Sequence, residues 1–446
     1  MAMAPFVVVF LTLAHLRSNT RTIQGAKWRT DPPRDNSIRL SKSPTQAAAR
    51  SRGIYRRSDP ERSKRDSVRG TSGGAAEISC GGHSAASCAE CSQNQGASFC
   101  NGDCIWDRQV ATCVERTSEV HPQYLKLIRH YPFQPVMTDR GEFVNVILVR
   151  SPFRSKTEWE LYHKYKDEIL FLGISSFESY PLSSPNPYSS NFSNDEYLGL
   201  FPGFLHMMHN PEAHFPAHVK TILMSQSDFA LPQISSAKAN DLRKNKVYDF
   251  TFSGSDQDIA NDCVGWSSFA KNWTFVKDAL EVMCGSDFNL KGVLVATKDK
   301  KNQTGCSIPA SCEGNIVQTP FLEQSDFYAY IKQSRFVFVP QVYDASPRVT
   351  TQALALDVPL LMNHHIEGGW KYLNRDTGEF FHDMSDFRES LQRLLGEIDT
   401  YQPKRWVTEH YGNEHAGKQL LKFVAENFGD RVTVPKGIKL LLPTGA

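Results

Sequence analysis

The second half of the chain alternates short apolar runs with segments in which apolar residues recur every three or four positions. Continuous apolar runs are typical of buried strands, and the wider spacing is typical of helices that pack on a sheet. Strands and helices in strict turn indicate parallel βαβ units with helices on both faces. The expected strands are 248–253, 292–297, 315–318, 336–340 and 359–362, and the expected helices are 273–283, 325–333, 347–356, 385–395 and 415–426.

A smaller region of the same kind precedes this one. Apolar runs predict strands at 143–149, 168–174 and 221–224, with helical stretches near 159–165 and 204–209. The predicted fold class is therefore α/β, with two Rossmann-like lobes at 120–240 and 246–430, of which the first is reduced.

The first 76 residues have a different character. Ala4–Leu16 is an apolar run of 13 residues, shorter than the about 20 that a membrane-spanning helix needs. A cleaved signal peptide at 1–17, a short anchor and a mis-assigned start all stay open, because no basic segment precedes the run and basic residues follow it. Residues 18–76 are rich in Arg, Ser, Thr, Pro and Gly without apolar pattern, which predicts a disordered basic linker.

The formal net charge of +2 conceals an uneven distribution. Residues 1–70 hold 15 basic and 5 acidic side chains, whereas the rest of the chain holds 35 basic and 43 acidic ones. An acidic body without a basic and aromatic stripe argues against a nucleic-acid partner, since such partners select a clustered basic face.

Cysteine spacing predicts an oxidising compartment. Six of the ten cysteines fall within 77–116 among Gly, Ser and Asn, which is typical of a disulfide-stapled module, although a zinc site there stays open. The other four are spaced for two local bridges, Cys263 with Cys284 and Cys306 with Cys312. Sequons at Asn191, Asn272 and Asn302 agree with the secretory pathway, that is, the ER or Golgi lumen or the exterior. The disulfide candidates are Cys80, Cys88, Cys91, Cys100, Cys104, Cys113, Cys263, Cys284, Cys306 and Cys312.

The candidate chemistry lies in the segment 334–352, SRFVFVPQVYDASPRVTTQ. Ser346 is a preferred helix N-cap, and Pro347 suits the first helical position because its missing N–H costs nothing there. The amides of the first turn carry the positive end of the helix dipole, so together with Arg348 they could hold a diphosphate. In parallel sheets ligands lie beyond the carboxyl ends of the strands, which is where this loop falls.

Asp344 and Gln352 stand eight positions apart, one before the helix and one two turns into it. Residues 315–396 resemble the nucleotide-sugar half of GT-B glycosyltransferases of the retaining families with a Glu-x7-Glu motif. The resemblance follows the order of the chain: a strand ending at Pro340, the acidic loop, the helix, the segment 355–359, the glycine pair Gly368-Gly369 and the segment 376–381. The Ser346-x-Arg348 segment is also similar to exostosin-like transferases.

The resemblance implies transfer of a sugar from a nucleotide-diphosphate sugar to a hydroxyl of a glycan or glycoprotein acceptor. The first lobe would bind the acceptor and the second the donor, with Arg348 and Asp344 as catalytic residues. Asp344 and Gln352 depart from the family by replacing its two Glu residues, and the family's Arg/Lys pair after the first donor-lobe strand has only Lys271 as a loose counterpart. The implied donor-binding residues are Ser346, Pro347, Val349, Thr350, Gln352, Gly254, Gly368 and Gly369.

No metal and no cofactor other than the donor substrate is expected. No Asp-x-Asp follows a predicted strand, and the helix start would take the place of a cation at the diphosphate. The histidines 206, 209, 214 and 218 match no known ligand spacing, but one of them could act as a base for the acceptor hydroxyl. A rival interpretation is a non-catalytic extracellular glycan-binding protein with a degenerate GT-B domain. Membrane association is expected only through the N-terminal apolar run, if it is uncleaved.

Overall fold

The computed structural model describes residues 78–80, 84–91, 104–107, 112–115, 122–175, 179–183, 196–231, 246–432 and 440–442. The apolar run at 4–16, the basic linker, Cys100 and the Asn191 sequon lie outside these residues. Among the helices within them, none combines the length and the apolar composition required to cross a membrane.

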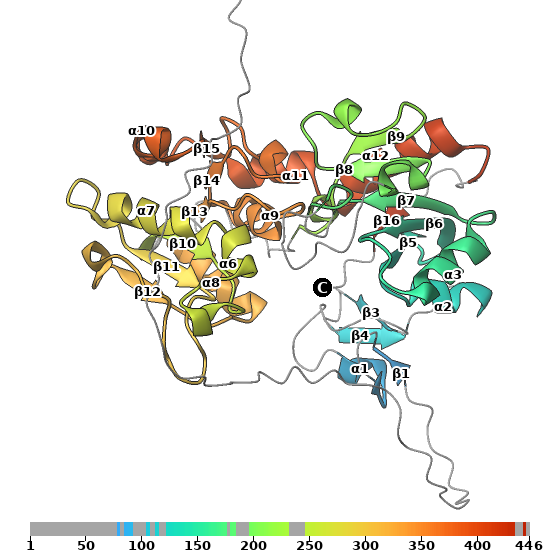
Figure 1. The fold of residues 1–446 in the computed structure, drawn as a ribbon, viewed down its shortest axis with the longest axis horizontal. Coiled ribbons are helices and arrows are strands. Elements are labelled where there is room, and N and C mark those ends of the chain that lie inside the picture. Colours follow the sequence, from blue (N-terminus) through green and yellow to red (C-terminus); the bar gives the residue numbers. More distant parts are fainter. Residues whose placement is uncertain are drawn as a thin grey trace, which may run out of the picture. The chain divides into compact units, whose positions relative to one another are not determined.

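The second lobe is built on a six-stranded parallel sheet (Figure 1). Its strands are β10 (Tyr248–Ser253), β11 (Gly292–Val295), β12 (Ile316–Gln318), β13 (Ser334–Val339), β14 (Leu360–Asn363) and β15 (Gly378–Phe381). They lie in the order β12-β11-β10-β13-β14-β15, so the direction of winding reverses between β10 and β13. This is the doubly wound arrangement that the alternation of strands and helices predicted, and β15 is the strand that the prediction omitted.

Two sets of helices cover the two faces of this sheet because successive strand residues point to opposite sides. Phe336 and Phe338 of β13 belong to the core beneath α7 (Trp273–Cys284) and α10 (Met384–Gly396). Val337 and Val339 belong to the opposite core, with α8 (Gln324–Gln333), α9 (Arg348–Ala355) and α11 (Pro403–His410). A short helix, α6 (Trp266–Ala270), precedes α7.

The first lobe has a mixed six-stranded sheet in the order β16-β5-β6-β7-β8-β9. Strands β6 (Phe143–Val149), β7 (Leu170–Ile174), β8 (Gly203–His206) and β9 (Lys220–Leu223) are parallel, whereas β5 (Phe133–Thr138) and β16 (Leu440–Leu441) add antiparallel pairings. Its helices are α2 (Leu125–Ile128), α3 (Lys156–Tyr165), α4 (Tyr197–Leu200) and α12 (Asn413–Phe428). The prediction of a helix near 204–209 was wrong, because 203–206 is a fully buried strand.

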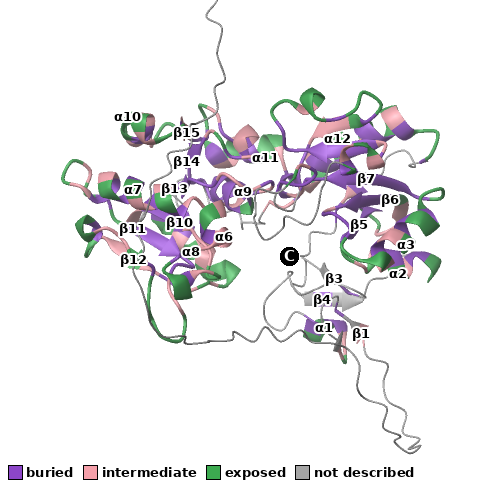
Figure 2. Ribbon diagram, viewed as in Figure 1, coloured by how far each residue is buried: buried purple, intermediate pink, exposed green. Residues whose placement is uncertain are grey.

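The long helix α12 belongs to the first lobe, although we expected the second lobe to extend to residue 430. Leu420 and Val424 pack in the same core as Val146 and Leu148 of β6, and Figure 1 draws α12 with the strands of the first sheet. At Gly417 a Cβ atom would lie 1.9 Å from the Leu440 carbonyl oxygen, so only glycine allows β16 to approach the helix this closely. Figure 2 shows the central strands of both sheets as buried.

Four disulfides are described. Cys80–Cys91 and Cys88–Cys104 hold the cysteine-rich module, whose elements are β1 (Ile78–Ser79), β2 (Ser84–Ala85), α1 (Cys88–Cys91), β3 (Cys104–Asp107) and β4 (Thr112–Glu115). In the second lobe the bridges are Cys263–Cys306 and Cys284–Cys312, so the predicted local pairing was wrong. Parallel strands bring residues distant in sequence together at one sheet edge, and the nearest cysteine in sequence is therefore not the nearest in space.

Candidate functional site

The candidate site lies where the winding of the second sheet reverses, beyond the carboxyl ends of β10 and β13. β10 is followed by Gly254, whose amide donates to the Val295 carbonyl at 2.9 Å. A Cβ at Gly254 would lie 2.9 Å from the Thr297 side chain. Close packing of the two strand ends therefore accounts for this glycine.

The start of α9 differs by one residue from the sequence prediction. Pro347, with extended backbone, is the N-cap, and Arg348 is the first helical residue. Ser346 therefore is not the N-cap, and no side chain caps α9. The Thr350 hydroxyl instead donates to the Pro347 carbonyl at 2.6 Å, and both Thr350 and Val349 are buried. Only the backbone of these two residues could serve a ligand.

Ser346 is engaged by the first lobe. The Ser227 amide donates to the Ser346 hydroxyl at 3.1 Å, and the Ser227 hydroxyl donates to the Ser346 carbonyl at 2.9 Å. Because Ser346 is bonded to Ser227, its side chain does not cap α9. The sequence pattern alone could not indicate this contact between the lobes.

A buried ion pair beside this contact also joins the lobes. Asp228 ends the short 3-10 helix η4 (Gln226–Asp228), and its carboxylate lies 2.6 Å from the Lys371 ammonium of η7 (Trp370–Tyr372). The same carboxylate accepts hydrogen bonds from the Tyr372 hydroxyl and from the Ser225 amide. Burial, with the Asp228 charge, raises the pKa of Tyr372, so that this hydroxyl stays protonated and donates.

Asp344 forms an ion pair with Lys271 across 3.0 Å. Its other carboxylate oxygen accepts the Ser346 amide at 3.2 Å, which orients the loop before α9. Lys271, the loose candidate of the sequence comparison, thus lies against Asp344 because α6 places it there. Both side chains are about one quarter exposed, at 27% and 22%, so the pair is accessible to a ligand.

Two guanidinium groups are connected with this pair, Arg348 through the Asp344 charge and Arg150 through Arg348. Arg348 reaches solvent, yet burial lowers its pKa while the Asp344 charge acts in the opposite direction. Burial also lowers the pKa of Arg150, which follows β6 in the first lobe, and the positive charge of Arg348 contributes to that shift. Sequence reasoning missed Arg150, although a charged residue directly after a buried parallel strand marks the ligand-binding edge of a sheet.

Gln352 lies one turn beyond Arg348 and is half-buried. Its side chain forms a hydrogen bond with the Tyr328 hydroxyl, to which Gln324 also donates at 2.7 Å. Burial raises the pKa of Tyr328 to about 12, so this hydroxyl remains a hydrogen-bond donor at neutral pH.

The glycine pair supports the loop that carries Asp344. The Gly368 amide donates to the Asp344 carbonyl at 3.0 Å, and a Cβ at Gly368 would lie 2.0 Å from the Ala345 carbonyl oxygen. Gly369 has a φ of +87° and packs on Pro347. Both glycines are therefore needed for close backbone approach at the site.

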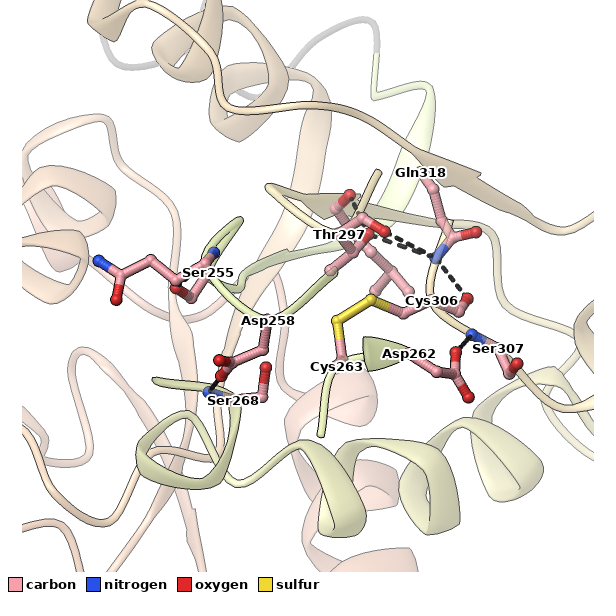
Figure 3. The surroundings of a disulfide bond; sticks show 11 residues. Ser255, Asp258, Asp262, Cys263, Ser268, Thr297, Cys306, Ser307 and Gln318 are labelled. Carbon is pink, nitrogen blue, oxygen red and sulfur yellow. Dashed lines mark hydrogen bonds between the residues drawn. A yellow bond between two sulfur atoms is a disulfide. The ribbon is translucent and has the colours of Figure 1, made fainter. Parts of the chain in front are cut away.

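The loop between β10 and α6 is fixed in several places (Figure 3). The Cys263–Cys306 disulfide joins it to the segment between β11 and β12, and the Asp262 carboxylate accepts the Ser307 amide at 2.5 Å. The Asp258 carboxylate accepts the Ser268 amide of α6 at 2.7 Å. These contacts hold α6, and so Lys271, in place.

The four candidate histidines do not converge. His206 is buried in β8, where burial and the Lys371 charge lower its pKa to about 4. His214 and His218 are exposed on the following loop, and the His209 ring stacks on Trp370 with centroids 4.0 Å apart. In the part of the chain that the structure describes, no group of three or more His, Cys, Asp or Glu side chains could hold a metal ion.

No protein-family model matches the sequence, and a search of curated proteins finds no match. Among solved structures, the chain is similar to sucrose-phosphate synthase from Thermosynechococcus elongatus, with 12% identity and a TM-score of 0.46 over 75% of this chain and 88% of that one. It is also similar to the lipopolysaccharide outer core galactosyltransferase WaaB, with 12% identity and a TM-score of 0.45 over 60% and 71%.

A third similar structure is the pneumococcal O-GlcNAc transferase GtfA in complex with UDP and GlcNAc, with 12% identity and a TM-score of 0.41 over 61% of this chain and 56% of that one. Likeness of fold at this identity does not transfer an activity. A function for this chain has to come from its own side chains.

Proposed function

We propose that the chain is a glycosyltransferase that moves a sugar from a nucleotide-diphosphate sugar to an acceptor hydroxyl, without a metal ion, in the secretory pathway. The supporting observation is the gathering of Lys271, Arg348 and Arg150 near the start of α9, at the point where the sheet reverses its winding. Asp344 is the carboxylate that interacts with Lys271 and Arg348, so the local charge is net positive. Such a site suits an anionic diphosphate.

In the proposed reaction these groups stabilise the departing diphosphate. The bond between the sugar's anomeric carbon and the diphosphate oxygen breaks, and the electron pair stays on the diphosphate. Arg348 and the amides of the first helical turn stabilise the charge that grows there. The acceptor oxygen bonds to the anomeric carbon and its hydroxyl proton passes to solvent water, which leaves a glycosylated acceptor and a nucleoside diphosphate.

Asp344 has a different part in this proposal. Its carboxylate faces the donor sugar and accepts hydrogen bonds from sugar hydroxyls, while Lys271 orients it. Gln352, one turn farther along α9, and Tyr328 of α8 offer hydrogen bonds to the ribose. Metal independence is proposed because fixed cations and a helix start already supply positive charge at the diphosphate.

Secretory localisation is supported by the disulfides of both regions, since such bonds persist in oxidising compartments. The glycan-binding alternative is supported by a specific contact. Ser346 is already hydrogen-bonded to Ser227, and Asp344 to Lys271, so protein groups occupy partners that a donor would use.

Nucleotide binding by the full chain tests the proposal. Titration calorimetry with UDP and GDP should show binding, and Arg348→Ala should weaken it at least tenfold, because a charge-assisted hydrogen bond contributes about 1.5–3 kcal/mol. Arg348→Lys should lose less, and Arg375→Ala, an exposed arginine of the same lobe, should bind like the native protein. Native affinity in Arg348→Ala would refute the diphosphate site.

Turnover gives a second test. Nucleotide sugars are screened with the full chain for hydrolysis or transfer, with EDTA added to parallel reactions. Unchanged rates in EDTA are expected, whereas activity that requires Mg²⁺ or Mn²⁺ would refute metal independence. Nucleotide binding without any turnover would favour the non-catalytic alternative.

A further inference from the structure

Three aromatic side chains form an exposed surface beside the candidate site. Trp266 and Phe269 lie on α6, and Tyr343 lies on the loop before α9. The ring centroids are 5.7 Å apart for Trp266–Phe269, 5.8 Å for Trp266–Tyr343 and 5.5 Å for Phe269–Tyr343, the last pair being stacked. We call these three rings the aromatic platform.

The platform is open to solvent. Phe269 is 57% exposed, and Val264, just before α6, is 70% exposed. Trp266 and Tyr343 are half-buried, which fixes their rings without covering them. A contiguous exposed apolar surface of this kind typically marks a binding site, because its burial by a ligand is favourable.

The platform is also held rigidly against the candidate site. Lys271 ends α6 and pairs with Asp344, the residue that follows Tyr343. The capping contact of Asp258 and the Cys263–Cys306 disulfide fix the other end of α6. Preorganised rings lose little conformational entropy when a ligand stacks on them.

The platform adjoins one particular end of the donor site. Gln352 lies one turn into α9 beside Tyr328 of α8, and these two side chains fit the ribose, whereas Asp344 precedes α9 and fits the sugar. Because the diphosphate would lie at the helix start between these ends, Tyr343 places the platform on the sugar side. A group bound there meets the sugar rather than the nucleobase.

We infer that the aromatic platform binds a pyranose ring of the acceptor glycan. This inference rests on the proposed function for the position of the donor. A pyranose has an apolar C–H face and a rim of hydroxyls. The platform offers flat rings bordered by the Lys271–Asp344 ion pair, so the C–H face stacks on the rings and rim hydroxyls bond to the charged pair. The acceptor site would then include part of the second lobe.

Glycan binding by the full chain tests the inference. The probe is a printed array of neutral and acidic oligosaccharides, read with the native protein, with Phe269→Ala and with Trp266→Ala. We expect the native protein to bind array glycans and each variant to lose at least tenfold in signal or affinity. Phe269→Tyr keeps a stacking face and should restore binding. Phe321→Ala, which removes a phenylalanine that is 66% exposed elsewhere in the lobe, should bind like the native protein.

The inference is overturned if the native protein binds no glycan. It is also overturned if the native protein and the platform variants bind glycans equally. A tenfold loss of UDP affinity in Phe269→Ala would assign the rings to the nucleobase instead. A native dimer that Phe269→Ala converts to a monomer in sedimentation would assign them to a second copy of the chain.

The glycan array and the nucleotide titration test the platform inference and the proposed function separately. If the array signal depends on the platform while UDP and GDP do not bind, the platform stands and the transferase proposal fails. If the nucleotide binds through Arg348 and no glycan binds, the proposed donor site stands and the inference about the platform fails.

Discussion

The Asp228 carboxylate is the buried charge whose removal should affect this protein most clearly. Its side chain is 3% exposed and the Lys371 side chain 8% exposed, at a separation of 2.6 Å. Asp228→Asn keeps the shape but removes the charge, which leaves the Lys371 ammonium buried without its counter-charge. Breaking such a pair costs about 3–5 kcal/mol in the free energy of unfolding.

Chemical denaturation of the full chain, followed by fluorescence and circular dichroism, measures this loss. Lys418→Gln is the matched control, because its ion pair with Glu414 is exposed and should contribute less than about 1 kcal/mol. Asp228→Asn/Lys371→Met removes both charges and should recover part of the stability, since no uncompensated ammonium remains. A loss in Asp228→Asn no larger than that of the control would refute the account of a desolvated pair joining the lobes.

Three further predictions concern the disulfides, the pH dependence and the glycosylation. Cys263→Ser/Cys306→Ser should lower the free energy of unfolding by about 4 kcal/mol, from the loop entropy of a 43-residue separation, in the same denaturation assay; a loss below about 1 kcal/mol would contradict it. His206 has a folded-state pKa of about 4, below its ordinary 6.5, so the stability linked to its neutral form is complete above pH 6.5 and falls by about 3 kcal/mol as pH approaches 4. His206→Gln should flatten that part of the pH profile, and an unchanged slope would rule out this cause. In material secreted from eukaryotic cells, mass spectrometry should find a glycan on exposed Asn302 but none on Asn272, whose amide donates to the Pro340 carbonyl at 3.1 Å; modified Asn272 would show that this contact forms late or not at all.

Much of the fold was predictable because its strands are unbroken apolar runs. The runs at 248–253 and 143–149 appear as strands with the predicted bounds. β5 was missed because Gln134 and Pro135 interrupt its apolar pattern, and β8 was misassigned because its short run also fits a helix. Periodicity describes one element at a time, so the return of α12 to the first lobe had no local signal.

The site was predictable only in part, for a related reason. The segment around Asp344 and Arg348 carried its own signal in a strand, a loop and a helix. The charges around this segment could not be predicted, because Lys271 and Arg150 come from other elements. The contact of Ser346 with Ser227 could not be predicted either, because Ser227 belongs to the other lobe. Contacts between distant segments depend on the tertiary packing, and the same is true of the disulfide pairing.

The return of α12 makes the second lobe an insertion within the sequence of the first. The chain leaves the first lobe after Phe229, which still packs in its core, and comes back at Gly412, whose amide donates to the Asp228 carbonyl at 2.7 Å. The described ends of the two connections between the lobes therefore adjoin at one point. Opening or closing of the lobes would turn about that point, and a chain truncated before residue 412 would lose core of the first lobe while keeping every strand of the second.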